Sequence, residues 1–194
     1  MRVCFLDLET TGLSSELHDM WEIGAILRGP LDGGADVEYC WQIRPDLTWA
    51  EPKALQIGGY YQRCQLVDAE VGSAFGGIVG PGDEAGATTS TAVAARLAQL
   101  LDGAHLVAAN VAFDDRFLQA FMRDNGQCAT HEYHLVDVEA FAAGALAMPP
   151  KWNLDRLLDR FGITIDAADR HTALGDARLV RDLYDAVMAG KGRR

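Results

Sequence analysis

Four acidic residues and one histidine are the side chains of this sequence whose types and positions could do chemistry: Asp7, Glu9, Asp114, His171 and Asp176. They come from three short segments, FLDLETTG, NVAFDDRFL and RHTALGDARLV. Each lies where an apolar segment should carry a hydrophobic side chain or end. Gathering carboxylates in one cleft is unfavourable unless cations hold them there. Because oxygen ligands suit Mg²⁺ or Mn²⁺ rather than zinc, the pattern favours a site for such an ion.

The first segment places Asp7 and Glu9 two residues apart at the end of an expected strand. Side chains at this spacing leave the same face of a strand. The Thr-Thr-Gly that follows predicts a turn. An exposed Asp-x-Glu at a strand end is common by itself, so this segment gains its meaning from the other two.

In the second segment, helical geometry separates Asp114 from Asp115. At 100° per residue, Asp114 falls inside the apolar stripe of the expected helix, whereas Asp115 points away from it. That stripe consists of Phe113, Phe117, Leu118 and Phe121. A carboxylate on a buried face needs a reason, which a metal supplies. We therefore assign Asp114 to the site and interpret Asp115 as solvated surface.

The third segment repeats this pattern on the last expected helix. Asp176 lies in the core-facing stripe with Val180, Leu183 and Val187. His171 precedes Asp176 by five residues, just upstream of the helix, where its ring can turn toward the same cleft. A lone histidine is usually surface or core filler, but these neighbours favour a functional role.

Length and composition indicate a single domain. The chain has 194 residues and 49% hydrophobic content, enough for one core, expected over residues 1–189 with a basic, disordered tail at 190–194. No apolar run is long enough to span a membrane, and the N-terminus does not resemble a signal peptide. The four cysteines are far apart, which predicts reduced thiols rather than a zinc site or disulfides. We therefore expect a cytoplasmic protein without a membrane partner.

The net charge of −11 argues at first against a nucleic-acid partner, because phosphate binding normally uses a basic surface. The objection weakens if two divalent cations cancel the charge of the four carboxylates, since phosphate then meets metal rather than protein. Affinity for long duplexes should still be low. Action on a short single-stranded end is compatible with this charge.

Hydrophobic periodicity and turn signals predict an α/β fold with a mixed sheet. Strands are expected over residues 3–8, 21–27, 37–43, 105–109 and 133–136. Helices are expected over residues 54–57, 91–101, 113–125, 153–161 and 174–188, with a further one beginning near 137. A hairpin linker is expected at 29–34. Residues 66–91, rich in glycine and without clear periodicity, are expected to form a long loop insertion.

Taken together, FLDLETTG, NVAFDDRFL and HTALGD resemble the three motifs of the DnaQ-like, DEDDh-type 3′→5′ exonucleases. The segments WEIGAIL, EPKALQIGG and WNLDRLLDRFGI are also similar to that family, so the resemblance covers most of the chain apart from 66–91 and the tail. Three motifs in the same order as in the family are a much more specific indication of membership than a single Asp-x-Glu. One departure is Ala109, where many members have a histidine before the asparagine.

The resemblance implies a ribonuclease-H-like fold, a five-stranded mixed sheet flanked by helices. It implies two Mg²⁺ (or Mn²⁺) ions held by Asp7, Glu9, Asp114 and Asp176, with His171 as the general base for the attacking water. Contacts with the terminal nucleotide are implied for Thr10, Thr11, Gly12, Leu13 and Asn110. Histidine suits the role of base because it titrates near neutral pH.

The leading functional hypothesis is a metal-dependent 3′→5′ exonuclease that releases nucleoside 5′-monophosphates from single-stranded DNA. No sequence motif indicates a contact with a 2′-hydroxyl, so the sequence does not distinguish DNA from RNA as substrate. An exoribonuclease is therefore the nearest alternative. A DNA polymerase is a candidate partner, in proofreading or repair. Loss of some of the metal-binding residues would favour an exonuclease-like binding module without activity. All five motif residues are present, so this alternative is less favoured. A ribonuclease-H-like endonuclease or integrase does not fit a histidine five residues before the last aspartate.

Overall fold

A computed structural model describes residues 2–29, 35–78, 86–164 and 166–191 of the chain. Its strands are β1 (Arg2–Thr10), β2 (Met20–Arg28), β3 (Val37–Ile43), β4 (Ser73–Ile78), β5 (Gly86–Thr89), β6 (Ala104–Ala108) and β7 (Val136–Asp137). Its helices are α1 (Pro52–Ile57), α2 (Tyr60–Arg63), α3 (Ser90–Leu101), α4 (Val111–Asp124), α5 (Val138–Ala145), α6 (Leu154–Phe161) and α7 (Ala173–Met188).

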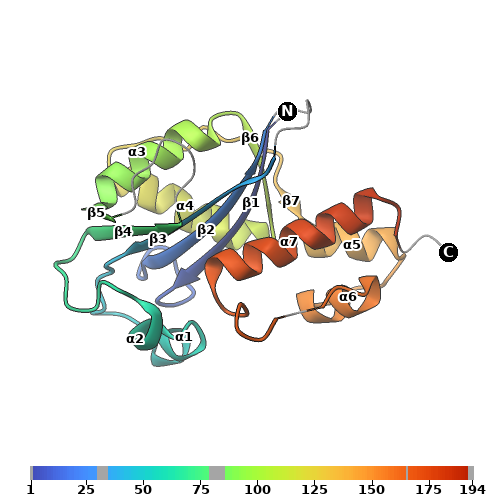
Figure 1. The fold of residues 1–194 in the computed structure, drawn as a ribbon, viewed down its shortest axis with the longest axis horizontal. Coiled ribbons are helices and arrows are strands. Elements are labelled where there is room, and N and C mark those ends of the chain that lie inside the picture. The colour runs from blue at the N-terminus through green and yellow to red at the C-terminus, as the bar shows by residue number, and fades with distance from the viewer. Residues whose placement is uncertain (1, 30–34, 79–85, 165, 192–194) are drawn as a thin grey trace.

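The strands form one mixed sheet in the order β5-β4-β3-β2-β1-β6-β7 (Figure 1). The pairs from β1 through β5 are antiparallel, whereas β6 runs parallel to both β1 and β7. The α/β class and the mixed sheet predicted from sequence are confirmed. Four of the five expected strands are present and are neighbours in the sheet, whereas the strand expected at 133–136 is only the two-residue β7, which begins at Val136.

The expected number of five strands is wrong, because the described part of the sheet contains seven. The two additional strands, β4 and β5, come from the glycine-rich segment 66–91 that was expected to be a loop. They pair with each other, and β4 extends the sheet beyond β3. Strands at or next to the edge of a sheet are held by backbone hydrogen bonds to their neighbours, so a hydrophobic period need not reveal them. Residues 79–85, between the two strands, lie outside the described residues.

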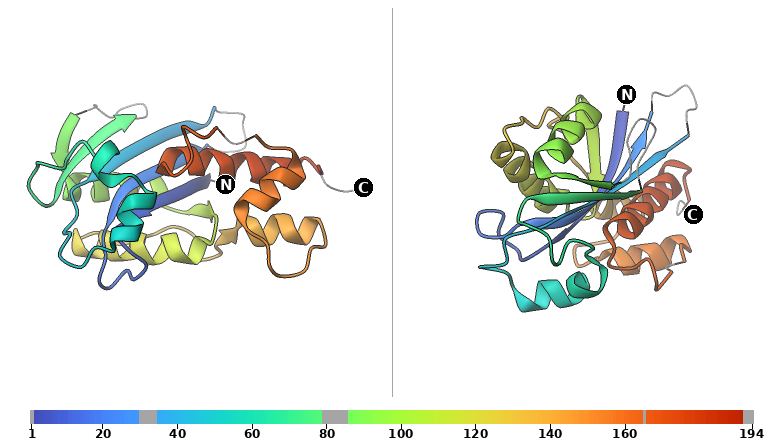
Figure 2. Two further views of the ribbon diagram at one scale, coloured as in Figure 1. Left: turned by 90° about the horizontal axis from the view of Figure 1, so that it is seen from below. Right: turned by 60° about the vertical axis from the view of Figure 1, so that its left-hand side comes forward.

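Helices cover both faces of the sheet (Figure 2). On one face α3 and α4 bury a core with β1 and β2 that includes Leu6, Leu97 and Leu118. On the other face α5, α6 and α7 pack on a second core that includes Phe5 and Leu183. The ribbon is therefore three layers deep, with the sheet in the middle.

Strand β1 supplies side chains alternately to the two cores, as a period of two requires. Val3 and Phe5 belong to the core under α7. Asp7 and Glu9 continue the same face toward the carboxyl end of the strand, beyond the point where apolar packing ends. The alternation thus directs both carboxylates to the face that α7 covers.

The helix boundaries follow local capping signals. The side chains of Thr89, Asn153 and Thr172 accept hydrogen bonds from backbone amides at the starts of α3, α6 and α7. Helix α1 begins with Pro52, which suits a first helical position. The short helix α2 was not expected from the sequence.

Three further expectations concern the chain as a whole. All four cysteines are free thiols, as predicted. Among the described residues, no helix combines the length and apolar character needed to cross a membrane. Most of the predicted hairpin linker at 29–34 and of the tail at 190–194 lies outside the described residues. The single domain over residues 1–189 stays a prediction.

Candidate active site

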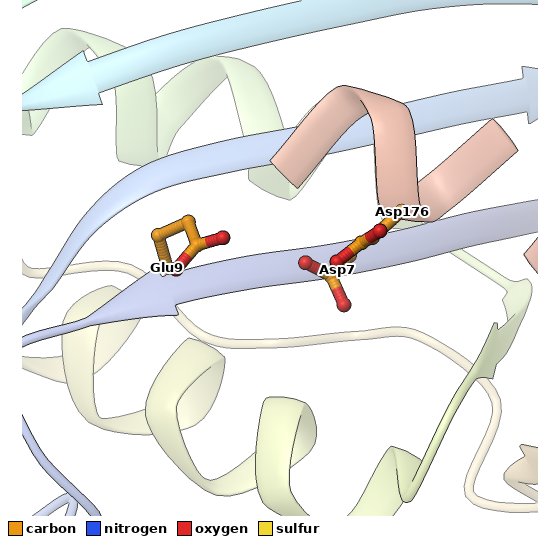
Figure 3. A group of neighbouring side chains, drawn as sticks. All are labelled: Asp7, Glu9 and Asp176. Atoms are coloured by element: carbon orange, nitrogen blue, oxygen red, sulfur yellow. The ribbon is translucent and has the colours of Figure 1, made fainter. Parts of the chain in front are cut away.

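Three of the predicted acids, Asp7, Glu9 and Asp176, lie together at the junction of β1 and α7. One carboxylate oxygen of each lies within 4.8 Å of the others. Figure 3 shows the Asp176 side chain reaching from the start of α7 toward Asp7, with Glu9 farther along β1. Residues separated by about 170 positions are therefore brought into one cluster, as the motifs predicted.

The close approach of α7 to the sheet depends on a glycine of the second strand. A Cβ atom built on Gly24 would lie 2.2 Å from the backbone carbon of Ala173, the first residue of α7. Because real side chains do not tolerate such a distance, only glycine lets the helix start directly on β2. The register places Gly24 opposite Asp7, so this contact also sets Asp176 over Asp7.

The two oxygens of Asp176 have different surroundings. Oδ2 accepts a hydrogen bond of 2.5 Å from Nη1 of Arg170, whose Nη2 bonds Asp155 at 2.9 Å. Oδ1 is buried and has no hydrogen-bond partner among the described residues. An unpartnered buried carboxylate oxygen is costly. Arg170 therefore holds one oxygen of Asp176, and the other oxygen is available to bind a cation.

The cluster is electrostatically unfavourable as it stands. Burial raises the pKa of Asp7 well above its ordinary value, and the charges of Asp114, Asp176 and Glu9 raise it further. Burial likewise raises the pKa of Glu9, to about 8, against the lowering effect of Arg63. These shifts are typical of like charges gathered in a poorly hydrated site, which is often a functional one.

Asp114 lies in the first turn of α4 and is 3% exposed, as the helical stripe predicted. It is not a member of the three-carboxylate cluster. Burial raises the pKa of Asp114, opposed by hydrogen bonds from the backbone amides of Asp114 and Leu8. Its charge nevertheless acts on Asp7, so the fourth acid belongs to the same electrostatic environment.

His171 is exposed and lies just before α7, with a left-handed backbone (φ 61°). Side chains other than glycine seldom adopt this conformation, and it persists only where surrounding contacts impose it. Burial raises the pKa of Asp176; Arg170 opposes this rise most, and His171 opposes it to a smaller extent. The histidine therefore lies near the cluster with its ring accessible.

The Thr-Thr-Gly turn after β1 is held by internal hydrogen bonds. The Thr10 hydroxyl donates to the Gly12 carbonyl (2.8 Å), and the Thr11 hydroxyl accepts from the Asp19 amide (3.0 Å). Both threonines are buried, whereas Leu13 is 73% exposed. Gly12 packs against the His18 ring, where a Cβ would be 2.5 Å away. The turn thus presents Leu13 to solvent.

Asn110, the last residue predicted to contact substrate, is the exposed N-cap residue of α4. Its backbone is left-handed (φ 54°), and its side chain does not cap the helix. The side-chain amide is therefore not used to cap the helix. Asn110 lies three residues after Val107, the last residue of β6 that pairs with β1.

Three charged residues of the site were not identified from the sequence: Glu22, Arg63 and Arg170. Glu22 is 3% exposed and is paired in register with Glu9 on the neighbouring strand. The Arg63 guanidinium bonds Glu22 at 2.7 Å and lies 4.0 Å from Glu9. Glu22 could have been identified from the sequence, because it is a carboxylate inside the apolar strand WEIGAIL. No local sequence pattern indicated a role for Arg63 or Arg170.

The interpretation of Asp115 as solvated surface is wrong. Its side chain is 15% exposed and lies 2.8 Å from Nε2 of His131, whose side chain is 6% exposed. It also accepts two hydrogen bonds from Gln119, one turn farther along α4. The helical wheel correctly separated Asp115 from Asp114, but it could not reveal the segment after α4 that covers this side of the helix.

The donor set fits a divalent cation. It consists of carboxylate oxygens whose like charges a cation would neutralise, and one buried oxygen of Asp176 has no partner in the residues that the structure describes. Hard oxygen donors without thiolate or imidazole in the cluster match the preferences of Mg²⁺ and Mn²⁺.

The raised pKa of Glu9 predicts that the metal-free protein loses stability as pH rises from about 4.5 to about 8. In that window the folded state retains a proton that the unfolded state has released, so unfolding becomes easier with increasing pH. The expected loss is on the order of a few kcal/mol. Thermal melting in EDTA across this range measures it, and added Mn²⁺ should reduce the slope.

Glu9→Gln is the matched control for this prediction, because the amide has the same shape and does not titrate. The variant should show a shallower pH dependence of melting in EDTA. Equal slopes for the variant and the native protein would mean that Glu9 is not the group responsible.

Comparison with known proteins assigns the class. A family model described as exonuclease, RNase T, matches residues 72–184, more than half of the chain. No curated protein matches the sequence. The chain therefore belongs to the exonuclease family, the DnaQ-like, DEDDh-type 3′→5′ exonucleases with a ribonuclease-H-like fold, as the three motifs predicted. The matched range does not reach Asp7 and Glu9, which the fold brings to Asp176.

Solved structures of exonuclease I share this fold. Product-bound exonuclease I aligns over 99% of this chain and 44% of its own, with 19% identity and a TM-score of 0.70. Escherichia coli exonuclease I in complex with a dT13 oligonucleotide aligns over 97% of this chain and 40% of its own, at 19% identity and a TM-score of 0.66. The zinc-bound form of the E. coli enzyme with single-stranded DNA has a TM-score of 0.67, at 19% identity over 98% of this chain and 40% of its own. This chain thus spans less than half the length of these proteins.

Proposed function

We propose that this protein is a divalent-metal-dependent 3′→5′ exonuclease that releases nucleoside 5′-monophosphates from single-stranded DNA ends. The observation that carries the proposal is the cluster of Asp7, Glu9 and Asp176, in which one buried oxygen of Asp176 has no partner within the described part of the chain. Membership of the exonuclease family supports the reaction type.

Asp7, Glu9, Asp114 and Asp176 would hold two Mg²⁺ or Mn²⁺ ions. When bound, such ions supply Lewis-acid stabilisation of the phosphate oxygens and lower the proton affinity of a bound water. Arg170 would keep Asp176 oriented through Oδ2, leaving Oδ1 directed at the cluster. The carboxylates of β1 would fix the ligand geometry, because a strand is a rigid support.

His171 would act as the general base, accepting the proton of the attacking water at a ring nitrogen. Its exposure and its position ahead of Asp176 support this role. Water attack at the last phosphodiester would break the bond to the 3′ oxygen of the preceding nucleotide. The product then carries its phosphate at the 5′ position.

The turn after β1 and the start of α4 would receive the terminal nucleotide. Leu13 offers an exposed apolar side chain against a base, and Asn110 an uncommitted amide. Thr10, Thr11 and Gly12 would shape the turn and offer backbone groups. We favour DNA over RNA because structural neighbours of the chain hold a dT13 oligonucleotide and single-stranded DNA. A cytoplasmic role with a DNA polymerase partner, in proofreading or repair, is part of the same proposal.

Incubation with a 5′-labelled single-stranded DNA oligonucleotide tests the proposal. We expect a ladder that shortens from the 3′ end with Mg²⁺ or Mn²⁺, and no shortening in EDTA. Asp7→Asn protein, purified in the same way, controls for contaminating nucleases. Degradation that resists the chelator, or intact substrate with both metals, would contradict the proposal.

Matched RNA and blunt-duplex oligonucleotides complete the substrate panel. Faster shortening of single-stranded DNA than of RNA is expected, and the acidic net charge predicts that duplex ends react slowest. A clear preference for RNA would instead favour the exoribonuclease alternative.

A further inference from the structure

Behind the acidic cluster lies a buried ion pair between β2 and the end of α2. Nη1 of Arg63 donates to both oxygens of Glu22, at 2.9 and 2.7 Å. The Glu22 side chain is 4% exposed and that of Arg63 is 25% exposed. Gln42 on β3 donates a third hydrogen bond to Glu22, at 2.9 Å. A buried carboxylate that accepts three hydrogen bonds, two of them from a guanidinium, is held in one geometry.

Each member of this ion pair also holds the backbone around His171. Nη2 of Arg63 donates to the His171 carbonyl at 2.9 Å. Oε2 of Glu22 accepts a hydrogen bond of 2.9 Å from the amide of Ala173, the first residue of α7. These two hydrogen bonds hold the backbone on either side of Thr172. They therefore fix the segment in which His171 has its left-handed backbone.

The Arg63 side chain is itself fixed by further contacts. Its Nε donates to the Gly58 carbonyl at 2.8 Å, and its guanidinium lies 4.9 Å from the centre of the Trp21 ring. The three nitrogens of one guanidinium thus bond three different partners: Gly58, Glu22 and His171. A lysine ammonium has the charge but not the planar fork that reaches all three in this geometry.

We propose that Arg63 is a positioning residue for His171, which sets the location of the histidine ring relative to the acidic cluster. This inference rests on the proposed function, in which His171 accepts a proton from water. Arg63 acts through the carbonyl of His171 and, by way of Glu22, through the start of α7. Precise placement of a proton acceptor matters because an error of about 1 Å can cost roughly 100-fold in rate.

Arg63→Lys is the first test, because it preserves the positive charge beside Glu22 and Glu9. We expect kcat to fall by roughly 10- to 100-fold, while KM and the affinity for Mn²⁺ stay within about twofold of the native values. Arg160→Lys, on the exposed side of the last turn of α6, is the matched control and should behave as the native protein. Unchanged kcat in Arg63→Lys would overturn the inference.

A double-mutant cycle with His171→Ala separates positioning from a purely structural role. If Arg63 acts through His171, Arg63→Lys should lower kcat in the native background and have no further effect in the His171→Ala background. Equal losses in both backgrounds would overturn the inference. Arg63→Gln, which keeps an amide donor, replaces the lysine variant if thermal melting shows that the latter does not fold.

Failure of the proposed function gives a different result from failure of this inference. If the native protein does not shorten DNA with Mg²⁺ or Mn²⁺, the proposed function fails before any variant is compared. If the native protein is active and His171→Ala is slow, but the cycle is additive, only the role of Arg63 is refuted.

Discussion

Asp7→Asn is expected to lower turnover by at least about 10³-fold, because it removes an anionic ligand from the centre of the proposed metal site. The same change should raise the melting temperature of the metal-free protein. Asp7 is half-buried near Glu9, Asp176 and Asp114. Its loss of hydration raises its pKa most, and these three charges raise it further, so a neutral amide relieves both costs. The variant would thus be inactive and more stable, as expected when function requires an unfavourable charge arrangement.

Two measurements on Asp7→Asn separate loss of the metal from loss of the fold. Thermal melting with and without Mn²⁺ should show stabilisation of the native protein and little of the variant. Asp182→Asn, an exposed aspartate on α7 that bonds only its neighbour Arg181 among the described contacts, is the matched control and should retain native turnover. Near-native rates in Asp7→Asn would remove Asp7 from the ligand set.

The acids of the site were predictable because each violates a local pattern. Asp114 and Asp176 occupy apolar stripes of helices, and both are buried in the structure, at 3% and 6% exposure. Asp7 and Glu9 share a strand face by the period of two. Such violations are visible in one sequence, since each is judged against neighbours within two helical turns or along one strand.

Arg63 could not be predicted in the same way, because its partners are distant in sequence. Arg63 meets Glu22 across 41 positions and His171 across 108. Arg63 breaks no local pattern, and the helix that carries it, α2, is only four residues long. The strands β4 and β5 were missed for a related reason, since their pairing to β3 and to each other is a tertiary contact that glycine-rich composition conceals.

His171→Ala is expected to lower kcat by roughly 10²- to 10⁴-fold, the usual contribution of a general base. Unlike Asp7→Asn, it should leave Mn²⁺ binding intact, because His171 is not among the carboxylates that form the cluster. Stabilisation by Mn²⁺ in thermal melting would then persist while turnover is lost. This difference would assign proton transfer to His171 and metal binding to Asp7.

Exposure of His171 offers a direct test of that assignment. Because the side chain is at the surface, its removal leaves a space that a small base can enter from solvent. Added imidazole should therefore restore part of the rate of His171→Ala and leave Asp7→Asn inactive. His134→Ala, another exposed histidine, should keep native turnover and give no response to imidazole. Full activity of His171→Ala without imidazole would show that water loses its proton to another acceptor, and the left-handed backbone at residue 171 would then serve only to start α7 above Asp7.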